Sequence, residues 1–437
     1  MNQINIKNKN PLNGEITPPP DKSISHRAVI ISSLSEGKSI IRNFLHAEDP
    51  MRTVNAFKQM GIETKEFKSS KVQKFKGSKD LVVIGKGLNG LREPKGIIDC
   101  GNSGTTMRLL CGVLAGQPFS ATLTGDSSLI RRPMQRVITP LTEMGASIQS
   151  EKGGYPPLTI RGGELKPIDY KSPVASAQVK SAILLAGLYC DGVTTVTEPA
   201  KSRDHTERML KAAGANVEIK NLEVSVTGKT NLKPSDITIP GDFSSAAFFI
   251  AAGAIVPDSN ISIKNVGINP TRTGLINILK VIGADIRFEN KREISGEPVA
   301  DIYIKHSELT GTEIGGDMAL RAIDEFPILC VVASVARGIT KISGVKELRV
   351  KESDRIASMA KELRKMGVRV EELEDGIIIT GRERLKAATV QSYGDHRVAM
   401  AMTIAGLVAD GETTVEDTEC INTSFPGFME ILKELQQ

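Results

Sequence analysis

The chain has 437 residues, of which 40% are hydrophobic and 24% charged, and its formal net charge is +5. This length is sufficient for two or more domains with full cores, and the composition excludes a low-complexity chain. The small basic excess suits a protein that handles small anions, whereas 4% aromatic residues and no basic stripe argue against a nucleic-acid-binding surface.

The start of the chain and its cysteines indicate where the protein works. Residues 1–10 are polar and lack the apolar segment of a signal peptide, and no uncharged apolar stretch reaches the roughly 18 residues of a membrane span. The five cysteines are scattered without zinc-site spacing, which favours small buried hydrophobes in a reducing compartment. We therefore expect a cytoplasmic protein with no membrane segment and neither a metal nor an organic cofactor.

One type of helix is predicted six times along the chain. A short polar or glycine-containing segment opens an apolar, alanine-rich run, and the run gives way to a β-branched stretch that predicts a strand. The six openings are Asp21–Arg27, Gly101–Arg108, Ser176–Ala182, Gly241–Ala247, Asp324–Cys330 and Gly394–Met400.

A second, amphipathic type of helix recurs between these and ends in a glycine followed by a strand. Glycine at this position supplies the left-handed cap of a helix C-terminus. The capping glycines are Gly61, Gly145, Gly214, Gly283 and Gly367. Because Gly283 and Gly367 follow Gly61 and Gly145 by the same 222 residues, the pattern predicts two similar halves of three units each.

Two proline-containing segments, Thr17–Pro20 and Leu232–Pro240, are the natural linkers between these halves. If both cross between the halves, one domain spans residues 20–240, and the other combines 1–19 with 241–437. Two domains joined by two short strands form a hinge that closes over ligands. The sequence therefore predicts an α/β protein with its active site in the cleft between two similar domains.

The openings of the first helix type carry cations, hydroxyls and amides where a helix N-terminus already attracts anions. Asp324, in an apolar context, and Glu352, between two cations, are the acid–base candidates. Each motif alone is also compatible with an ordinary helix cap or a surface ion pair. The polar residues at the openings are Lys22, Ser23, Arg27, Asn102, Ser103, Thr105, Ser176, Gln178, Lys180, His396 and Arg397.

Taken together and in order, the motifs resemble the 5-enolpyruvylshikimate-3-phosphate synthases over nearly the whole chain. They begin with DKSISHR at Asp21 and GNSGTTMR at Gly101, and continue with the TGD…RRP segment of Thr124–Pro133. The later motifs are SAQVKSA at Ser176, GDFSSAAFF at Gly241, DE at Asp324, VKESDR at Val350 and GDHRVAMA at Gly394. The resemblance implies a fold of two domains, each of three βαβαββ units.

The resemblance also implies a reaction. The enolpyruvyl group of phosphoenolpyruvate is transferred to the 5-hydroxyl of shikimate 3-phosphate by addition and elimination through a tetrahedral intermediate, and phosphate is released. Asp324 is expected to take the hydroxyl proton, and Glu352 to deliver a proton to C3 with Lys22 nearby. The implied phosphoenolpyruvate ligands are Lys22, Asn102, Gly104, Thr105, Arg132, Gln178, Arg355 and Arg397. The implied shikimate 3-phosphate ligands are Ser23, Arg27, Ser176, Ser202 and Lys351.

Two departures from the family pattern bear on these expectations. Thr423 stands before SFP, where many members have a lysine, so one phosphate contact is missing or replaced. The segments PDKS, SAQVK, RPMQR and NPTR (Asn269–Arg272) resemble the glyphosate-tolerant branch, although Gly104 is the small residue of sensitive enzymes. We therefore hypothesise reduced glyphosate inhibition.

Two alternatives remain open. A UDP-N-acetylglucosamine enolpyruvyl transferase shares the repeat, but that family has Lys-Asn at Lys22-Ser23 and a cysteine in the loop that corresponds to Asp126–Pro133, which contains none here. An RNA-end-processing or nucleic-acid-binding repeat protein would need a basic, aromatic surface. The longest basic cluster, Lys65–Lys79, favours a solvated loop or edge hairpin. The expected partners are therefore the two small substrates, with no nucleic acid or membrane, and the protein is expected to be a monomer.

Overall fold

The six predicted apolar helices are all present in the computed structural model, which describes residues 3–7, 10–67, 75, 78–381 and 384–437. Every residue of α7 and α12 is buried, and α1, α3, α5 and α10 are buried over most of their length. A helix that is apolar all round belongs in the centre of a domain. The bounds are α1 Lys22–Leu34, α3 Gly104–Ala115, α5 Ala177–Gly187, α7 Phe243–Ile255, α10 Phe326–Val335 and α12 His396–Leu407.

The amphipathic helices end as the glycine pattern predicts. Gly61, Gly145, Gly214, Gly283 and Gly367 all have positive φ, between 80° and 110°. A residue with a Cβ is strained in this conformation, so glycine ends each helix and turns the chain into the next strand. These helices are α2 Glu48–Gln59, α4 Gln135–Glu143, α6 His205–Ala212, α8 Gly274–Val281, α11 Arg355–Lys365 and the terminal α13 Phe428–Leu435.

Each pair of helices is associated with a small mixed sheet, so the repeat is a βαβαββ unit. In the unit that contains α3 and α4, β7 pairs in parallel with β6 and antiparallel with β9, which pairs antiparallel with β8. Residues 20–239 form three sheets. The strand order of the first is β14 Asp236–Thr238, β3 Glu36–Phe44, β5 Lys79–Lys86 and β4 Glu63–Phe67, and that of the second is β6 Ile98–Asp99, β7 Ser120–Thr124, β9 Tyr155–Arg161 and β8 Ser147–Glu151. The strand order of the third is β10 Asp169–Lys171, β11 Val193–Thr197, β13 Glu223–Thr227 and β12 Val217–Lys220.

The remaining sheets repeat this order with a shorter last member. The strand order of the first is β2 Asn13–Ile16, β15 Asn260–Gly267, β17 Glu297–Lys305 and β16 Asp285–Ile294, and that of the second is β18 Glu313–Ile314, β19 Ile339–Ile342, β21 Gly376–Thr380 and β20 Arg369–Leu373. The third has the three strands β23 Thr389–Gln391, β25 Glu412–Glu416 and β1 Gln3–Lys7. A separate pair consists of β22 Leu385–Lys386 and β24 Ala409–Asp410. Short helical segments are α9 Gly316–Arg321, η1 Leu129–Arg131, η2 Ile323–Glu325, η3 Lys346–Val350 and η4 Thr418–Thr423.

The chain divides into two compact units, and two strands are exchanged relative to chain order. One unit, here called the N unit, contains residues 20–239 and 294–297; the other, the C unit, contains 1–19, 240–293 and 298–437. β2 comes directly before α1 in the sequence but pairs in parallel with β15 of the C unit. β14 comes directly before α7 but pairs in parallel with β3 of the N unit. The turn of the β16–β17 hairpin, residues 294–297, groups with the N unit, unlike the rest of 241–437.

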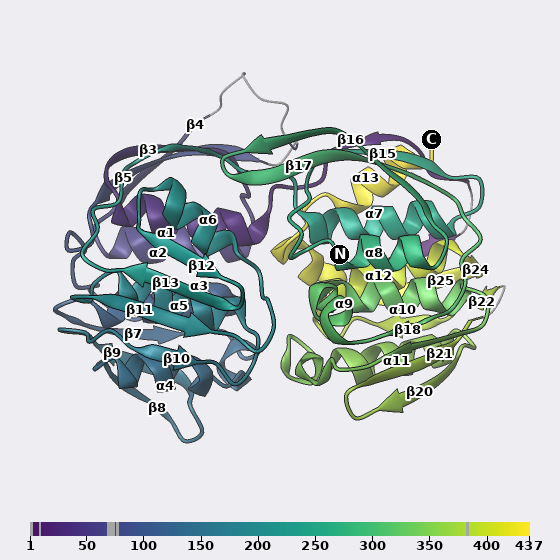
Figure 1. Ribbon diagram of the computed structural model, residues 1–437. Coiled ribbons are helices and arrows are strands. Elements are labelled where there is room, and N and C mark those ends of the chain that lie inside the picture. Colours follow the sequence, from purple (N-terminus) through teal and green to yellow (C-terminus); the bar gives the residue numbers. More distant parts are fainter. Residues whose placement is uncertain (1–2, 8–9, 68–74, 76–77, 382–383) are drawn as a thin grey trace. The chain divides into compact units, whose positions relative to one another are not determined.

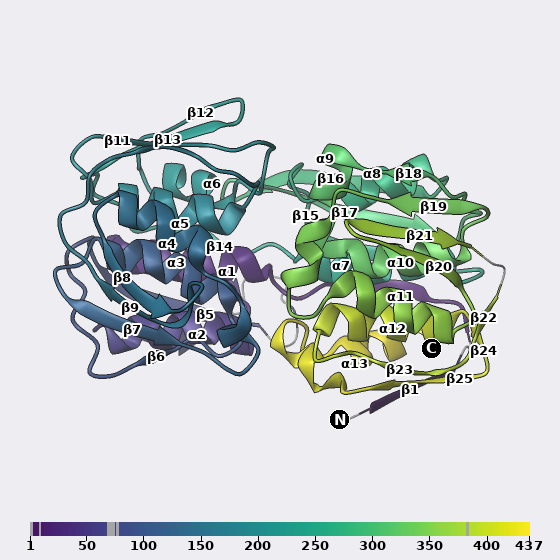
Figure 2. The same ribbon diagram turned by 90° about the horizontal axis from the view of Figure 1, so that it is seen from below.

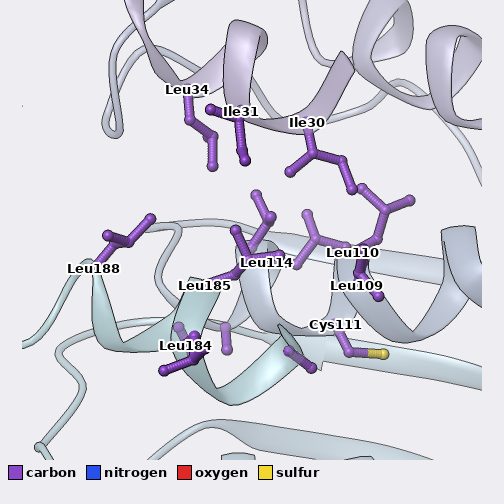
Figure 3. Close-up of a cluster of buried hydrophobic side chains, with 14 of the residues drawn as sticks. Ile30, Ile31, Leu34, Leu109, Leu110, Cys111, Leu114, Leu184, Leu185 and Leu188 are labelled. Atoms are coloured by element: carbon purple, nitrogen blue, oxygen red, sulfur yellow. The ribbon is translucent and has the colours of Figure 1, made fainter. Parts of the chain in front are cut away.

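The helices of each unit lie inside its sheets (Figure 1 and Figure 2). In the N unit the buried faces of α1, α3 and α5 converge, with Ile31, Leu110 and Leu185 among the side chains of one cluster (Figure 3). In the C unit Phe249 contacts Phe425 and Phe428 at ring-centroid distances of 5.9 and 5.5 Å. Because the central helices pack together along their length, their N-terminal ends are held in fixed positions.

Two observations complete the description. None of the helices in the described ranges is both long and apolar enough to cross a membrane. Four lysines of the predicted basic hairpin, Lys68, Lys71, Lys74 and Lys76, lie outside the described residues.

Candidate active site

Each central helix of the N unit begins at a side chain that caps it. Asp21 accepts from the Ile24 amide of α1 at 2.8 Å, Ser103 from the Thr106 amide of α3 at 3.1 Å and Ser176 from the Val179 amide of α5 at 3.4 Å. Capping fixes where each helix starts, and the helix N-terminus favours negative charge nearby. The local sequence therefore places anion-attracting helix ends at all three openings.

The starts of α3 and α5 are joined by hydrogen bonds. Gln178 accepts from Arg108 Nη1 at 2.7 Å and donates through Nε2 to Thr105 Oγ1 at 2.9 Å. An ideal Cβ on Gly104 would lie 2.7 Å from Arg108 Nη1 and 3.6 Å from Arg132 Nη1. Glycine at this position thus lets the Arg108 guanidinium approach the first turn of α3, while the distance to Arg132 is an ordinary contact.

Arg132 lies beside the same turn. Its Nη2 donates to Asn102 Oδ1 at 2.5 Å and to Ser128 Oγ at 3.0 Å, and its Nη1 donates to the Asn102 carbonyl at 3.3 Å. Asn102 also donates to Asp126 Oδ2 at 2.9 Å. The structure therefore brings together the predicted residues Asn102, Gly104, Thr105, Arg132 and Gln178, and it adds Arg108, which the sequence-based site lacks.

The first turn of α1 carries the next three predicted residues. Lys22 Nζ lies 3.1 Å from Asp49 Oδ2 of α2. The carbonyl of Ser23 accepts from Arg27 Nη1 at 3.0 Å. The buried Arg27 also donates to Thr206 Oγ1 at 2.6 Å and to Ser181 Oγ at 2.9 Å, which ties α1 to α6 and α5.

A buried chain of hydroxyls connects α1 with the cap of α3. The His26 Nδ1 atom lies 2.7 Å from Thr53 Oγ1, which lies 2.8 Å from Thr106 Oγ1. Thr106 in turn donates to Ser103 Oγ at 2.8 Å. Burial, together with Lys22 and Arg27, holds the pKa of His26 well below its usual range, so its imidazole is neutral.

One cation counted at the helix openings has a different role. Lys180 is buried, and its Nζ lies 2.7 Å from both Glu198 Oε2 and Glu207 Oε1. Burial opposes its charge, but Glu207 and Glu198 outweigh burial and raise the pKa of Lys180. Lys180 is therefore an internal counter-ion. Glu198 also accepts from Ser202 Oγ at 2.8 Å and from the Ser176 amide at 3.0 Å.

The C unit brings its predicted residues around one buried arginine. Arg355, the first residue of α11, donates through Nε to Asp395 Oδ2 at 2.8 Å and through Nη2 to Glu352 Oε2 at 2.9 Å. Its Nη1 lies 3.7 Å from Asp324 Oδ1. Burial opposes the guanidinium charge, but Asp395 and Glu352 raise the pKa of Arg355. Both acid–base candidates thus lie next to the same cation.

Arg397, near the start of α12, reaches Asp324 from another direction. Its Nη1 donates to the Asp324 carbonyl at 2.7 Å, and its Nη2 lies 3.8 Å from Asp324 Oδ2. Burial and repulsion from Arg355 lower the pKa of Arg397. Asp324 lies in the single turn η2, two residues before α10 begins, at the predicted helix opening.

Further contacts extend this cluster beyond the predicted residues. Glu325 lies 3.5 Å from Arg397 Nη1 and accepts from Ser244 Oγ at 2.5 Å. Ser244 and the α7 cap, Asp242, both accept from Arg272 Nη2. Sequence reasoning missed Glu325 and Asp395 as parts of the site; the signal available was their position next to Asp324 and Arg397.

Two predicted positions lie at the margin of these clusters. Lys351 is half-buried, and its Nζ lies 3.3 Å from Glu347 Oε1. Thr423 donates its hydroxyl to the Cys420 carbonyl at 2.7 Å, so the residue in the place of the usual lysine is used within η4. Across the described residues, no group of histidine, cysteine, aspartate or glutamate side chains is arranged to hold a metal ion.

The two clusters differ in what they can do chemically. The N unit carries Lys22, Arg27, Arg108 and Arg132 in or beside the first turns of its capped central helices, where they can bind phosphate and carboxylate groups. The C-unit cluster places the carboxylates Asp324 and Glu352 beside Arg355, where they can exchange protons with a reacting group. Together they contain both the cations and the acid–base groups of an anion-handling enzyme.

Comparison with known proteins identifies relatives along the whole chain. A family model described as EPSP synthase (3-phosphoshikimate 1-carboxyvinyltransferase) matches residues 6–432. Curated proteins named 3-phosphoshikimate 1-carboxyvinyltransferase include one from Thermodesulfovibrio yellowstonii, 54% identical over 100% of both chains, and one from Desulforamulus reducens, 53% identical over 97% of both. A solved EPSP synthase from Acinetobacter baumannii aligns with a TM-score of 0.87 and 44% identity, covering 99% of this chain and 98% of that one.

Proposed function

Because the chain belongs to the EPSP synthase (3-phosphoshikimate 1-carboxyvinyltransferase) family, we propose that it transfers the enolpyruvyl group of phosphoenolpyruvate to the 5-hydroxyl of shikimate 3-phosphate and releases phosphate. The reaction belongs to the shikimate pathway of aromatic amino acid biosynthesis. The observation that carries the proposal is the composition of the two clusters. Residues from distant stretches of chain form one cationic group at helix starts and one group of carboxylates around Arg355.

Each substrate is bound by residues of both units. Lys22, Asn102, Gly104, Thr105, Arg132 and Gln178 of the N unit, with Arg355 and Arg397 of the C unit, bind phosphoenolpyruvate. Ser23, Arg27, Ser176 and Ser202, with Lys351, bind shikimate 3-phosphate. Arginine forks match carboxylates and phosphates in two hydrogen bonds, while lysine supplies a point charge.

Asp324 is the general base for the 5-hydroxyl. Its carboxylate oxygens lie 3.7 Å from Arg355 Nη1 and 3.8 Å from Arg397 Nη2, so two guanidinium groups hold its position. Addition of the hydroxyl to C2 while C3 takes a proton gives the tetrahedral intermediate. Loss of phosphate and of a C3 proton then restores the double bond in the product.

Glu352 is the acid for C3, with Lys22 nearby. Arg355 Nη2 donates to Glu352 Oε2 at 2.9 Å, and this contact holds the carboxyl group of Glu352 in place beside the site of reaction.

The proposed working unit is a cytoplasmic monomer without metal or organic cofactor. Its two domains are the N unit and the C unit. The active site lies in the cleft between them, and closure about the two linking segments brings the cationic group and the carboxylates to the same pair of substrates.

The test is phosphate release from phosphoenolpyruvate, with shikimate 3-phosphate and UDP-N-acetylglucosamine offered in parallel. Release with shikimate 3-phosphate alone is expected. Release with only UDP-N-acetylglucosamine would transfer the chain to the other enolpyruvyl activity, and release with neither acceptor would contradict the reaction class. A salt-dependent shift on RNA would favour the nucleic-acid alternative.

A further inference from the structure

Glu198 occupies an unusual place in the N unit, directly after β11 and beside the start of α5. Its side chain is buried, and its carboxylate accepts from three donors. Oε1 accepts from the Ser176 amide at 3.0 Å, and Oε2 accepts from Ser202 Oγ at 2.8 Å and from Lys180 Nζ at 2.7 Å. One carboxylate therefore connects two serines that are 26 residues apart.

The buried charge of Glu198 is balanced by Lys180, which also contacts Glu207 at 2.7 Å. A buried carboxylate without such a partner would be strongly destabilising. Because Lys180 is held from both sides, its ammonium group fixes the position of Glu198, and Glu198 in turn fixes the serines. Glu207 shares Lys180, whereas in the part of the chain that the structure describes the Ser176 amide and the Ser202 hydroxyl donate to Glu198 and not to Glu207.

We propose that Glu198 is a positioning residue that sets the spacing of Ser176 and Ser202 for the phosphate ester of shikimate 3-phosphate. This inference rests on the proposed function. The serines come from different elements, the cap of α5 and the loop before α6. Glu198 holds Ser176 through its main-chain amide, which leaves the Ser176 hydroxyl hydrogen for the ligand. It holds Ser202 through the hydroxyl, so Ser202 turns its hydroxyl hydrogen from Glu198 to the phosphate when the ester binds.

Replacing the carboxylate by an amide cannot satisfy all three donors. If the glutamine oxygen faces Lys180 and Ser202, its NH₂ group points at the Ser176 amide. If the oxygen faces Ser176, the NH₂ group points at the ammonium of Lys180. In the first orientation a donor opposes the Ser176 amide, and in the second a donor opposes the Lys180 ammonium, so either the start of α5 or the contact to Lys180 is displaced.

The experiment compares Glu198→Gln with the matched control Glu207→Gln, since each removes one carboxylate from Lys180. In E198Q the KM for shikimate 3-phosphate is expected to rise about tenfold, as loss of a hydrogen bond to a charged group changes an equilibrium by about that factor. The KM for phosphoenolpyruvate and kcat should stay within about twofold. E207Q should change neither KM. Equal rises of both KM values in E198Q, or the same rise in E207Q, would overturn the inference.

Two further measurements keep the result interpretable. Glu198→Asp retains the charge beside Lys180 but withdraws the carboxylate by one methylene, so it tests positioning even where E198Q folds poorly; it should reproduce the selective KM rise. In a double-mutant cycle, E198Q should weaken the binding of shikimate 3-phosphate less in the Ser202→Ala background than in the wild type.

Calorimetric titration with shikimate 3-phosphate separates the role of Glu198 from the proposed function. An inactive wild type refutes the proposed function, whereas an unchanged Kd in E198Q refutes only the role of Glu198.

Discussion

The two units use the same repeat but equip their helix starts differently. In the N unit, Arg27 and Arg132 donate to hydroxyl and amide oxygens. In the C unit, Arg355 and Arg397 meet the carboxyl groups of Asp395, Glu352 and Asp324. A neutral acceptor can be exchanged for an anionic ligand at small electrostatic cost, whereas a buried ion pair that loses a partner is strongly destabilised. The difference predicts that Arg27 and Arg132 exchange their partners for substrate more readily than Arg355 and Arg397, which lie beside the acid–base carboxylates.

The largest effect is expected from Asp324→Asn, which keeps the shape of the side chain and removes the base. We expect kcat to fall by about 10²–10⁴-fold, the usual contribution of general acid–base catalysis, with a smaller change in either KM. Phosphate release under saturating substrates measures it. Asp317→Asn, at an exposed ion pair of α9, is the control. A rise in KM with kcat unchanged would place Asp324 among the binding groups and erase the distinction between the units.

A large but different effect is expected from Arg132→Ala in the N unit. Removing a guanidinium that meets a carboxylate or phosphate should raise the KM for phosphoenolpyruvate by about 10–100-fold, since charge-assisted hydrogen bonds contribute about 1.5–3 kcal/mol. The neighbouring Arg131, which is exposed, supplies the control Arg131→Ala. A loss confined to kcat would assign Arg132 to the chemical step and contradict the comparison.

These two regions also show what sequence can predict. The helix starts and the positive-φ glycines were predictable because each depends on local signals: a capping side chain such as Asp21, or a glycine such as Gly214 after an amphipathic run. The partners of buried charges were not. Lys180 was counted as an anion-binding cation, yet Glu198 and Glu207, which neutralise it, follow it by 18 and 27 residues and meet it only when α5, α6 and β11 pack.

A smaller effect tests why glycine occupies the first turn of α3. In Gly104→Ala the new Cβ lies 2.7 Å from Arg108 Nη1, so the end of that flexible side chain must shift away from Gln178. We expect a several-fold rise in the KM for phosphoenolpyruvate and little change in kcat. Gly96→Ala, where nothing lies within 4 Å of the added Cβ, is the control.

The same variants test the glyphosate hypothesis. An inhibition constant for the wild type similar to that of a sensitive enzyme would contradict reduced inhibition. A further drop in inhibition in Gly104→Ala would show that the inhibitor uses the space beside Arg108.

The smallest effect is expected from alkylation of the cysteines, because neither unit places a reactive thiol in its cluster. Burial raises the pKa of Cys111 in the N unit and of Cys420 in the C unit to about 12, and it also raises the pKa of Cys100, Cys190 and Cys330. The thiolate is the reactive form, so at pH 8 these side chains should react slowly. Treatment with iodoacetamide should therefore leave phosphate release unchanged. Rapid inactivation that phosphoenolpyruvate prevents would instead place a cysteine at the substrate, as in the related transferases with a loop cysteine. It would contradict a site in the N unit that is built from cations, hydroxyls and amides without a thiol.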